Sequence, residues 1–197
     1  PVFQAEDGIR DLASSLVGSE MCIRDRVKTI ALADAAVRKA RDLGLETIVL
    51  TSSLSGESRE VGRFFAAIAR EAHEKKRPIT PPCALIATGE TAVRIENEDY
   101  GKGGRNQEFA AGACLDLKPI DPIVICSLGT DGTDGPTPVA GAITDGSTIA
   151  RALSKGLDIH ELLRRHDIYT LLTAVGDTIE THDTETNVCD IAVAVVL

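Results

Sequence analysis

Residues Tyr100-Gly-Lys-Gly-Gly-Arg-Asn-Gln-Glu108 place three glycines around two cations, and the apolar run Phe109-Ala-Ala-Gly-Ala-Cys-Leu115 follows directly. This pattern predicts a tight glycine loop that opens into a helix beginning near Arg105. The first turn of a helix has unpaired N–H groups and the positive end of the helix dipole, so it suits an anion. Lys102 and Arg105 add positive charge there. A basic surface turn before an amphipathic helix fits the same local pattern.

A second loop is acidic and follows the predicted buried strand Pro122–Leu128. It reads Gly129-Thr-Asp-Gly-Thr-Asp-Gly-Pro-Thr137, with Asp131 and Asp134 three residues apart among glycines. Mg²⁺ is commonly held by one or two carboxylates together with substrate phosphates, so this loop is a candidate magnesium site. A turn-rich loop in which the aspartates cap their own backbone is the alternative.

Two further polar segments lie beside apolar strands. Glu90 follows the predicted strand Cys83–Thr88, and ligands of open α/β sheets gather at such strand ends. The loop Thr181–Asp190 precedes the predicted closing strand Ile191–Val196. Its hydroxyls and its amide suit a polyhydroxy acid or a phosphate, and equally suit self-capping turns. Three loops, offering cations, carboxylates and neutral donors, could therefore converge at one edge of a sheet.

Three motifs in this order resemble the MOFRL domain: Lys-Gly-Gly-Arg-Asn-Gln-Glu (102–108), the acidic loop 129–137 and Thr186-Asn-Val188. That domain forms the C-terminal part of type II glycerate kinases, a family often labelled hydroxypyruvate reductases. The resemblance covers residues 83–197 and extends weakly to residue 27. The chain departs from the family at Thr88, usually a second glycine, at His182-Asp183, usually Gly-Pro, and at His166–Tyr169, often Asn-Asp-Ser-Tyr.

The resemblance implies an ATP- and Mg²⁺-dependent transfer of phosphate to D-glycerate in a cleft between two domains, with the 2- or 3-hydroxyl as acceptor. It implies a catalytic role for Arg105 and Lys102, substrate contacts, and metal ligands at Asp131 and Asp134. The implied substrate contacts are Glu90, Asn106, Thr186 and Asn187. Two other functions stay open: a hydroxypyruvate reductase, although no Gly-x-Gly-x-x-Gly fingerprint follows a strand, and a non-catalytic sugar-acid-binding module.

Composition narrows the class of protein. The chain has 197 residues, of which 43% are hydrophobic and 26% charged, which is ordinary for a globular protein. A net charge of −9 and 3% aromatic residues argue against nonspecific nucleic-acid binding. No apolar run approaches the roughly 20 residues of a membrane span. Five scattered cysteines without a Cys-x-x-Cys pair indicate reduced thiols and a cytoplasmic protein.

The alternation of helices and strands predicts an α/β fold, a three-layer α/β/α sandwich preceded by a fragment of a Rossmann-like α/β domain. Residues 1–26 resemble translated sequencing-adapter read-through, and we expect them to contribute little to the core. Residues 27–80 are expected to be the remnant of an N-terminal kinase domain that is otherwise missing, and residues 81–197 the MOFRL domain. The predicted elements of the remnant are a helix over 30–43, a strand over 46–50 and a helix over 57–76 with Phe64 and Phe65 inward.

Overall fold

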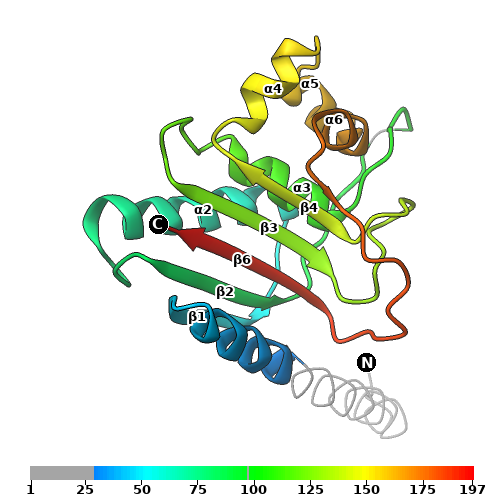
Figure 1. Cartoon of the computed structure of the whole chain (residues 1–197). Helices are drawn as coiled ribbons and strands as arrows, with labels where there is room; N and C mark the ends of the chain where they lie inside the picture. Colours follow the sequence, from blue (N-terminus) through cyan, green and yellow to red (C-terminus); the bar gives the residue numbers. More distant parts are fainter. Residues whose placement is uncertain (1–28, 97) are drawn as a thin grey trace, which may run out of the picture.

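The computed structural model describes residues 29–96 and 98–197. A single mixed sheet of six strands, in the order β1-β2-β6-β3-β4-β5, forms the centre of the molecule (Figure 1). β1 and β2 are parallel, whereas β6 is antiparallel to both of its neighbours, β2 and β3. The strands are β1 (Glu46–Leu54), β2 (Cys83–Gly89), β3 (Ile123–Gly129), β4 (Gly141–Asp145), β5 (Thr178–Ile179) and β6 (Asp190–Val196).

Helices flank the sheet, which confirms the predicted α/β class. α2 (Ser58–Lys75) and α3 (Arg105–Cys114) pack on one face, and a helix over 29–42 lies on the other face beside β1 and β2 (Figure 1). Among the described residues, the three predicted layers are all present at the β1–β2 side of the sheet. Farther along the second face, Val124 of β3 and Ile143 of β4 are 38% and 40% exposed. Three short helices stand beyond β4: α4 (Thr148–Ser154), α5 (Ile159–Arg164) and α6 (Ile168–Val175).

The first half of the described chain shares one core with the second half. β1 continues the same sheet through its parallel pairing with β2, and Phe65 of α2 packs edge-on against Phe109 of α3 with ring centroids 5.5 Å apart. Phe65 is 2% exposed, but Phe64 is 68% exposed, so the prediction that both point inward is wrong for Phe64. β1 and α2 therefore pack in one sheet and core with the residues after 80. The expected division at residue 80 stays a prediction, and residues 1–26 lie outside the described residues.

α2 and α3 approach each other closely because each carries a glycine at the contact. A Cβ atom on Gly62 would overlap the carbonyl oxygen of Phe109, and one on Gly112 would overlap that of Arg59. Larger side chains would force the helices apart, since packed interiors have no spare volume. This contact brings the first turns of α2 beside the second half of α3, and places Arg59 next to Glu108.

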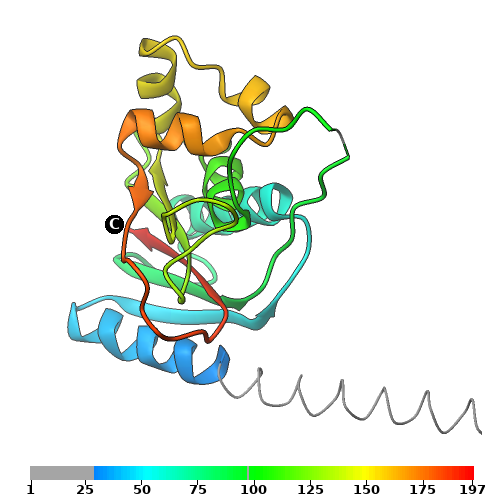
Figure 2. The same cartoon turned by 90° about the vertical axis from the view of Figure 1, so that its right-hand side faces the viewer.

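The strand register brings the predicted loops to one edge of the sheet. Gly89 at the end of β2 and Gly129 at the end of β3 both pair with Asp190 at the start of β6. The long loop between β2 and α3 runs outward from this edge and returns beside α6 (Figure 2). Within this loop, Ala92 forms an isolated bridge to Glu57.

Candidate functional site

α3 begins at Arg105, where the glycine loop ends, as the sequence predicted. Gly104 is the N-cap residue and has an extended backbone, with φ −153°. The anion at this positive helix end is the carboxylate of Asp134: the backbone N–H of Asn106 donates to Oδ1 at 3.0 Å and that of Gln107 to Oδ2 at 2.9 Å. The N-terminus of α3 is therefore capped from within the chain.

Side-chain hydrogen bonds and burial fix the carboxylate of Asp134 further. Its carboxylate also accepts hydrogen bonds from the side-chain amides of Asn106, at 3.2 Å, and Gln107, at 2.9 Å. It is 2% exposed, and a Cβ atom on Gly104 would overlap it. Burial raises the pKa of the Asp134 carboxyl, while these hydrogen bonds act in the opposite direction. This geometry favours a structural role for Asp134 over that of a metal ligand.

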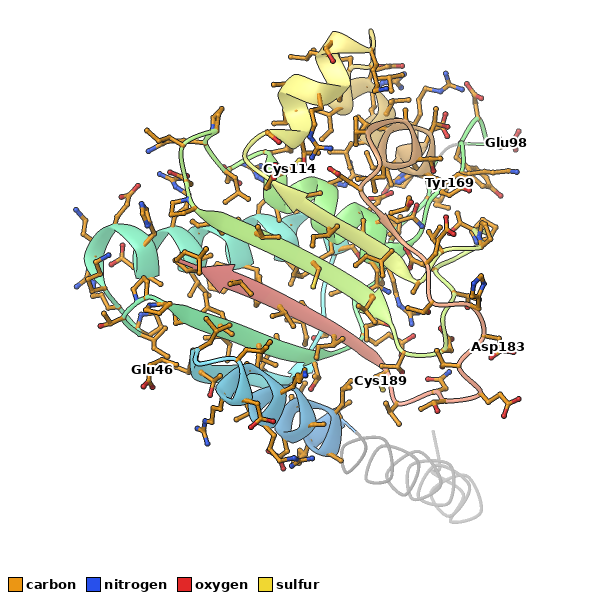
Figure 3. All side chains as sticks on the ribbon, in the orientation of Figure 1. Glu46, Glu98, Cys114, Tyr169, Asp183 and Cys189 are labelled. Atoms are coloured by element: carbon orange, nitrogen blue, oxygen red, sulfur yellow. The ribbon has the colours of Figure 1, made fainter. Side chains whose placement is uncertain are left out.

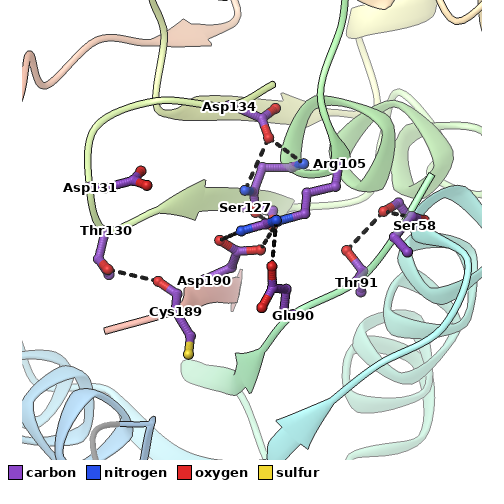
Figure 4. A network of polar contacts seen from close by, with 12 residues as sticks. Ser58, Glu90, Thr91, Arg105, Ser127, Thr130, Asp131, Asp134, Cys189 and Asp190 are labelled. Carbon is purple, nitrogen blue, oxygen red and sulfur yellow. Dashed lines mark hydrogen bonds and ion pairs between the residues drawn. The ribbon is translucent and has the colours of Figure 1, made fainter. Parts of the chain in front are cut away.

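Arg105 lies in the middle of the site, between two carboxylates (Figure 4). Its Nε donates to Oδ2 of Asp190 at 2.5 Å and its Nη2 to Oδ1 at 3.0 Å, a bidentate pair. Its Nη1 donates to Oε1 of Glu90 at 2.6 Å. The hydrogen bonds that Arg105 donates to Asp190 raise the pKa of Arg105 above its ordinary value, so the guanidinium is permanently charged.

Asp190 was not predicted as a site residue. It stands at the junction of a polar loop and an apolar strand, and nothing in the local pattern distinguishes it from a strand-edge residue. Only the register of β6 with β2 and β3 places it opposite Arg105. Asp190 is 5% exposed, and burial raises the pKa of its carboxyl while the contact with Arg105 lowers it. The pairing of a strand end with a helix start is a feature that only the fold reveals.

The acidic loop and the hydroxyl-rich loop meet beside Arg105, which confirms that the three predicted loops converge. Thr130 Oγ1 donates to the carbonyl oxygen of Cys189 at 2.7 Å and accepts from the backbone N–H of Val188 at 2.9 Å. Thr184 contacts the acidic loop twice. Its hydroxyl donates to the carbonyl oxygen of Thr130, and its N–H donates to the carbonyl oxygen of Asp131 at 3.3 Å. Figure 3 shows Asp183 and Cys189 on this loop as it leads into β6.

The remaining predicted residues occupy different environments. Asn106 is 1% exposed, and its Oδ1 accepts a hydrogen bond from Ser127 Oγ at 2.6 Å. Lys102, Thr186 and Asn187 are exposed. Asp131 is half-buried, and its Oδ1 accepts from the N–H of Thr133 at 3.1 Å. Within residues 29–96 and 98–197, no three His, Cys, Asp or Glu side chains form a group that could hold a metal ion.

A cavity of about 210 Å³ lies beside the first turn of α3. Apolar side chains and glycines of the loops line much of it, and the ionisable residues in its lining are Tyr100, Arg105, Glu108 and His166. Glu108 does not pair with Arg105 one turn before it. Its Oε1 lies 2.6 Å from Nδ1 of His166. No helix in the part of the chain that the structure describes is long and apolar enough to cross a membrane.

The sequence and the fold of this chain are similar to those of known proteins. D-glycerate 2-kinase of Thermotoga maritima is 42% identical over 164 residues, 83% of this chain and 39% of that protein. Glycerate 2-kinase of Pyrococcus horikoshii is 40% identical over 163 residues, with 83% and 37% covered. The crystal structure of glycerate kinase from Thermotoga maritima superposes with a TM-score of 0.81, covering 84% of this chain and 39% of that one.

The chain thus spans about two fifths of the length of these relatives. The model of the MOFRL family matches residues 83–190, which contain the glycine loop, the acidic loop, the hydroxyl-rich loop and Asp190. This chain belongs to the MOFRL family.

Proposed function

We propose that this chain is part of an ATP- and Mg²⁺-dependent kinase that phosphorylates D-glycerate on its 2-hydroxyl. The observation that carries the proposal is the permanently charged Arg105, held by Asp190 and Glu90 at the meeting point of three loops. The names of relatives 42% and 40% identical support the substrate and the position of phosphorylation. Because the chain spans 39% and 37% of these relatives, the rest of the cleft would come from a preceding domain.

Arg105 would act as an anion clamp. The two hydrogen bonds to the buried Asp190 fix the plane of the guanidinium, so that its orientation needs no reorganisation during the reaction. Glu90 is a different kind of partner, because its side chain is 60% exposed. A substrate carboxylate or phosphoryl group can replace Glu90 at Nη1 while Asp190 stays in place. Glu90 would thus reserve the position of the substrate anion.

Asp131 is the carboxylate that fits a magnesium ligand. The residue is half-buried, the carboxylate has one hydrogen bond among the described residues, accepted by Oδ1 from Thr133, and no helix end encloses it. Mg²⁺ takes one or two protein carboxylates and completes its octahedron with phosphate oxygens and water, so one aspartate suffices. Bound MgATP would supply the transferable phosphoryl group and neutralise the charge that develops on it.

The exposed predicted residues have supporting roles in this proposal. Lys102, Thr186 and Asn187 lie at the solvent side of the loops, where they can contact phosphate or sugar-acid oxygens. Asn106 acts indirectly, because its amide is enclosed between Asp134 and Ser127. In this proposal the site therefore combines one fixed cation, one carboxylate for the metal and a set of exposed neutral or cationic contacts.

The test uses a chimera in which this chain replaces the matching segment of the Thermotoga maritima D-glycerate 2-kinase. We expect the chimera to release ADP only when D-glycerate is present, with 2-phosphoglycerate as the product in ³¹P NMR. NADH oxidation with hydroxypyruvate, in the absence of ADP release, would instead identify a reductase. Binding of glycerate without turnover of either kind would leave only a sugar-acid-binding module.

Arg105→Lys tests the clamp within that chimera. A single ammonium cannot reproduce the planar fork, and loss of one preorganised contact typically costs about 3 kcal/mol, on the order of a hundredfold in rate. We expect Arg105→Lys to fail nearly as badly as Arg105→Ala, and Lys102→Arg to be better tolerated. Arg164→Lys, in an exposed pair with Glu161, is the matched control. An Arg105→Lys variant within about threefold of the parent in kcat/KM for glycerate would remove Arg105 from the mechanism.

A further inference from the structure

Residues 165–169 join α5 to α6 and include the first two residues of α6; they lie directly against the glycine loop, and we call them the α5–α6 turn. The N–H of Gly101 donates to the carbonyl oxygen of Arg165 at 2.8 Å, and that of Lys102 to Oδ1 of Asp167 at 3.1 Å. In return, the N–H of Tyr169 donates to the carbonyl oxygen of Lys102 at 2.9 Å. Figure 2 shows the loop descending beside α6 before it enters α3.

The fit between loop and turn is tight. A Cβ atom on Gly101 would overlap the side chain of Asp167, and one on Gly103 would lie 3.2 Å from the carbonyl oxygen of His166. The glycines therefore allow two backbones to touch, which is a requirement of packing rather than of a ligand at those positions. The path of the chain into α3, and with it the position of Arg105, is set by the α5–α6 turn.

The same turn reaches α3 again through a buried carboxylate. Glu108 is 1% exposed, its Oε1 lies 2.6 Å from Nδ1 of His166, and its Oε2 lies 3.5 Å from Nη2 of Arg59. Burial raises the pKa of Glu108, while the contacts with His166 and Arg59 oppose that rise. A buried charge without partners is strongly destabilising, so these contacts hold Glu108 and the turn together.

His166 contributes through its backbone as well. Its φ is 52°, in the left-handed region that histidine enters more readily than most residues and that asparagine tolerates well. This conformation turns the chain from α5 toward α6 and aims the imidazole at Glu108. Arg59 of α2 approaches the same imidazole, at 3.5 Å from Nδ1. Three elements, α2, α3 and the turn, therefore meet at Glu108.

We propose that Glu108, His166 and Asp167 are positioning residues for Arg105, acting from both sides of it. Asp167 holds the loop three residues before Arg105, and His166 holds Glu108 three residues after it. The α5–α6 turn thus fixes the backbone on both sides of Arg105, and Asp190 fixes the guanidinium at the end of the side chain. The expected effect on catalysis rests on the proposed function. The positioning of Arg105 does not, because it can be measured without turnover.

The test is the Nε–H signal of Arg105 in the ¹⁵N-labelled full chain. In the parent, the hydrogen bond to Asp190 protects this proton from exchange with solvent. We expect Asp167→Ala and Glu108→Gln to speed its exchange by roughly tenfold, the effect of weakening one charged hydrogen bond. His166→Asn should retain protection, because asparagine accepts the left-handed backbone and can donate to Glu108, whereas His166→Ala should lose it. Glu161→Gln, in an exposed pair on α5, is the control and should leave the exchange rate unchanged.

A unique prediction of positioning is non-additivity. In the chimera, Asp167→Ala should lower kcat/KM for glycerate at least tenfold in the parent background and hardly at all once Arg105 is lysine. Unchanged Arg105 exchange in folded Asp167→Ala protein would overturn the proposal, whether or not the chimera is a kinase. Should Glu108→Gln fail to fold, the Asp167 variant alone decides. Altered exchange with an inactive chimera would uphold the positioning and refute the kinase assignment instead.

Discussion

Replacing Asp134 by alanine should destabilise the protein far more than replacing Asp131, although the two aspartates stand three residues apart in one loop. Asp134 accepts hydrogen bonds from four N–H groups of Asn106 and Gln107, two of the backbone and two of the side chains. The carboxylate of Asp131 accepts one, from Thr133 in its own turn. The sequence presents these residues as equivalents, whereas the fold gives them different roles.

The magnitude follows from these contacts. Loss of an N-cap side chain costs about 1 kcal/mol, and each buried N–H group left without an acceptor costs about 1 to 3 kcal/mol. Water can reach part of the vacated space, and removing a buried carboxylate returns its cost of desolvation. We therefore expect Asp134→Ala to lower the free energy of unfolding by about 3 kcal/mol, and Asp131→Ala by less than about 1 kcal/mol.

Urea denaturation followed by circular dichroism measures this difference. With a slope of about 2 kcal/mol per molar urea, the midpoint of Asp134→Ala should fall by about 1.5 M, and that of Asp131→Ala by less than about 0.5 M. Asp134→Asn should resemble alanine, because its NH₂ group would face N–H donors. Equal midpoints for the two alanine variants would show that the cap of α3 is not the stabilising contact described above.

Three other outcomes are expected. In the chimera, Asp131→Asn should raise the Mg²⁺ concentration required for activity and leave the circular dichroism spectrum intact; an unchanged requirement would remove the acidic loop from the mechanism. Gly112→Ala, which forces α3 from the carbonyl oxygen of Arg59, should cost about 2 kcal/mol and lower the melting temperature by roughly 5 °C; an unchanged melting temperature would contradict the close contact. Burial raises the pKa of the Cys114 thiol to about 12, from 9.0, so the folded state keeps a proton that the unfolded state loses. Stability should therefore fall by about 1 kcal/mol per pH unit above pH 9, and Cys114→Ala should remove that part of the loss, as urea midpoints at pH 8 to 11 would show.

Elements with a strong local pattern were predictable. The apolar runs at β2, β3 and β6 were recognised as strands, and the start of α3 was located at Arg105 because glycines give way abruptly to apolar residues. Boundaries were less certain: β1 extends to Leu54, four residues beyond the prediction, because β2 offers a partner along its whole length.

Features that depend on distant partners were not predictable. The burial of Glu108 is decided by His166, 58 residues farther along, and no local pattern distinguishes it from an exposed helix carboxylate. The same holds for Asp190, whose role depends on strand register. Phe64 and Phe65 are adjacent and equally apolar, and only the position of α3 decides which one faces inward. Local chemistry therefore located the loops of the site, but tertiary contacts assigned their residues.

The central place of β6 has a consequence for biosynthesis. β6 follows every other strand of the sheet in sequence, yet it lies between β2 and β3. At about 5 to 20 residues per second, the roughly 60 residues from the end of β3 to β6 take on the order of 3 to 12 s to synthesise. During that time the sheet is two separate halves, each with an unpaired inner edge that can associate with another chain. The arrival of residues 190–196 closes both edges and delivers Asp190 to Arg105, so a nascent chain acquires its finished sheet and its fixed guanidinium in a single step.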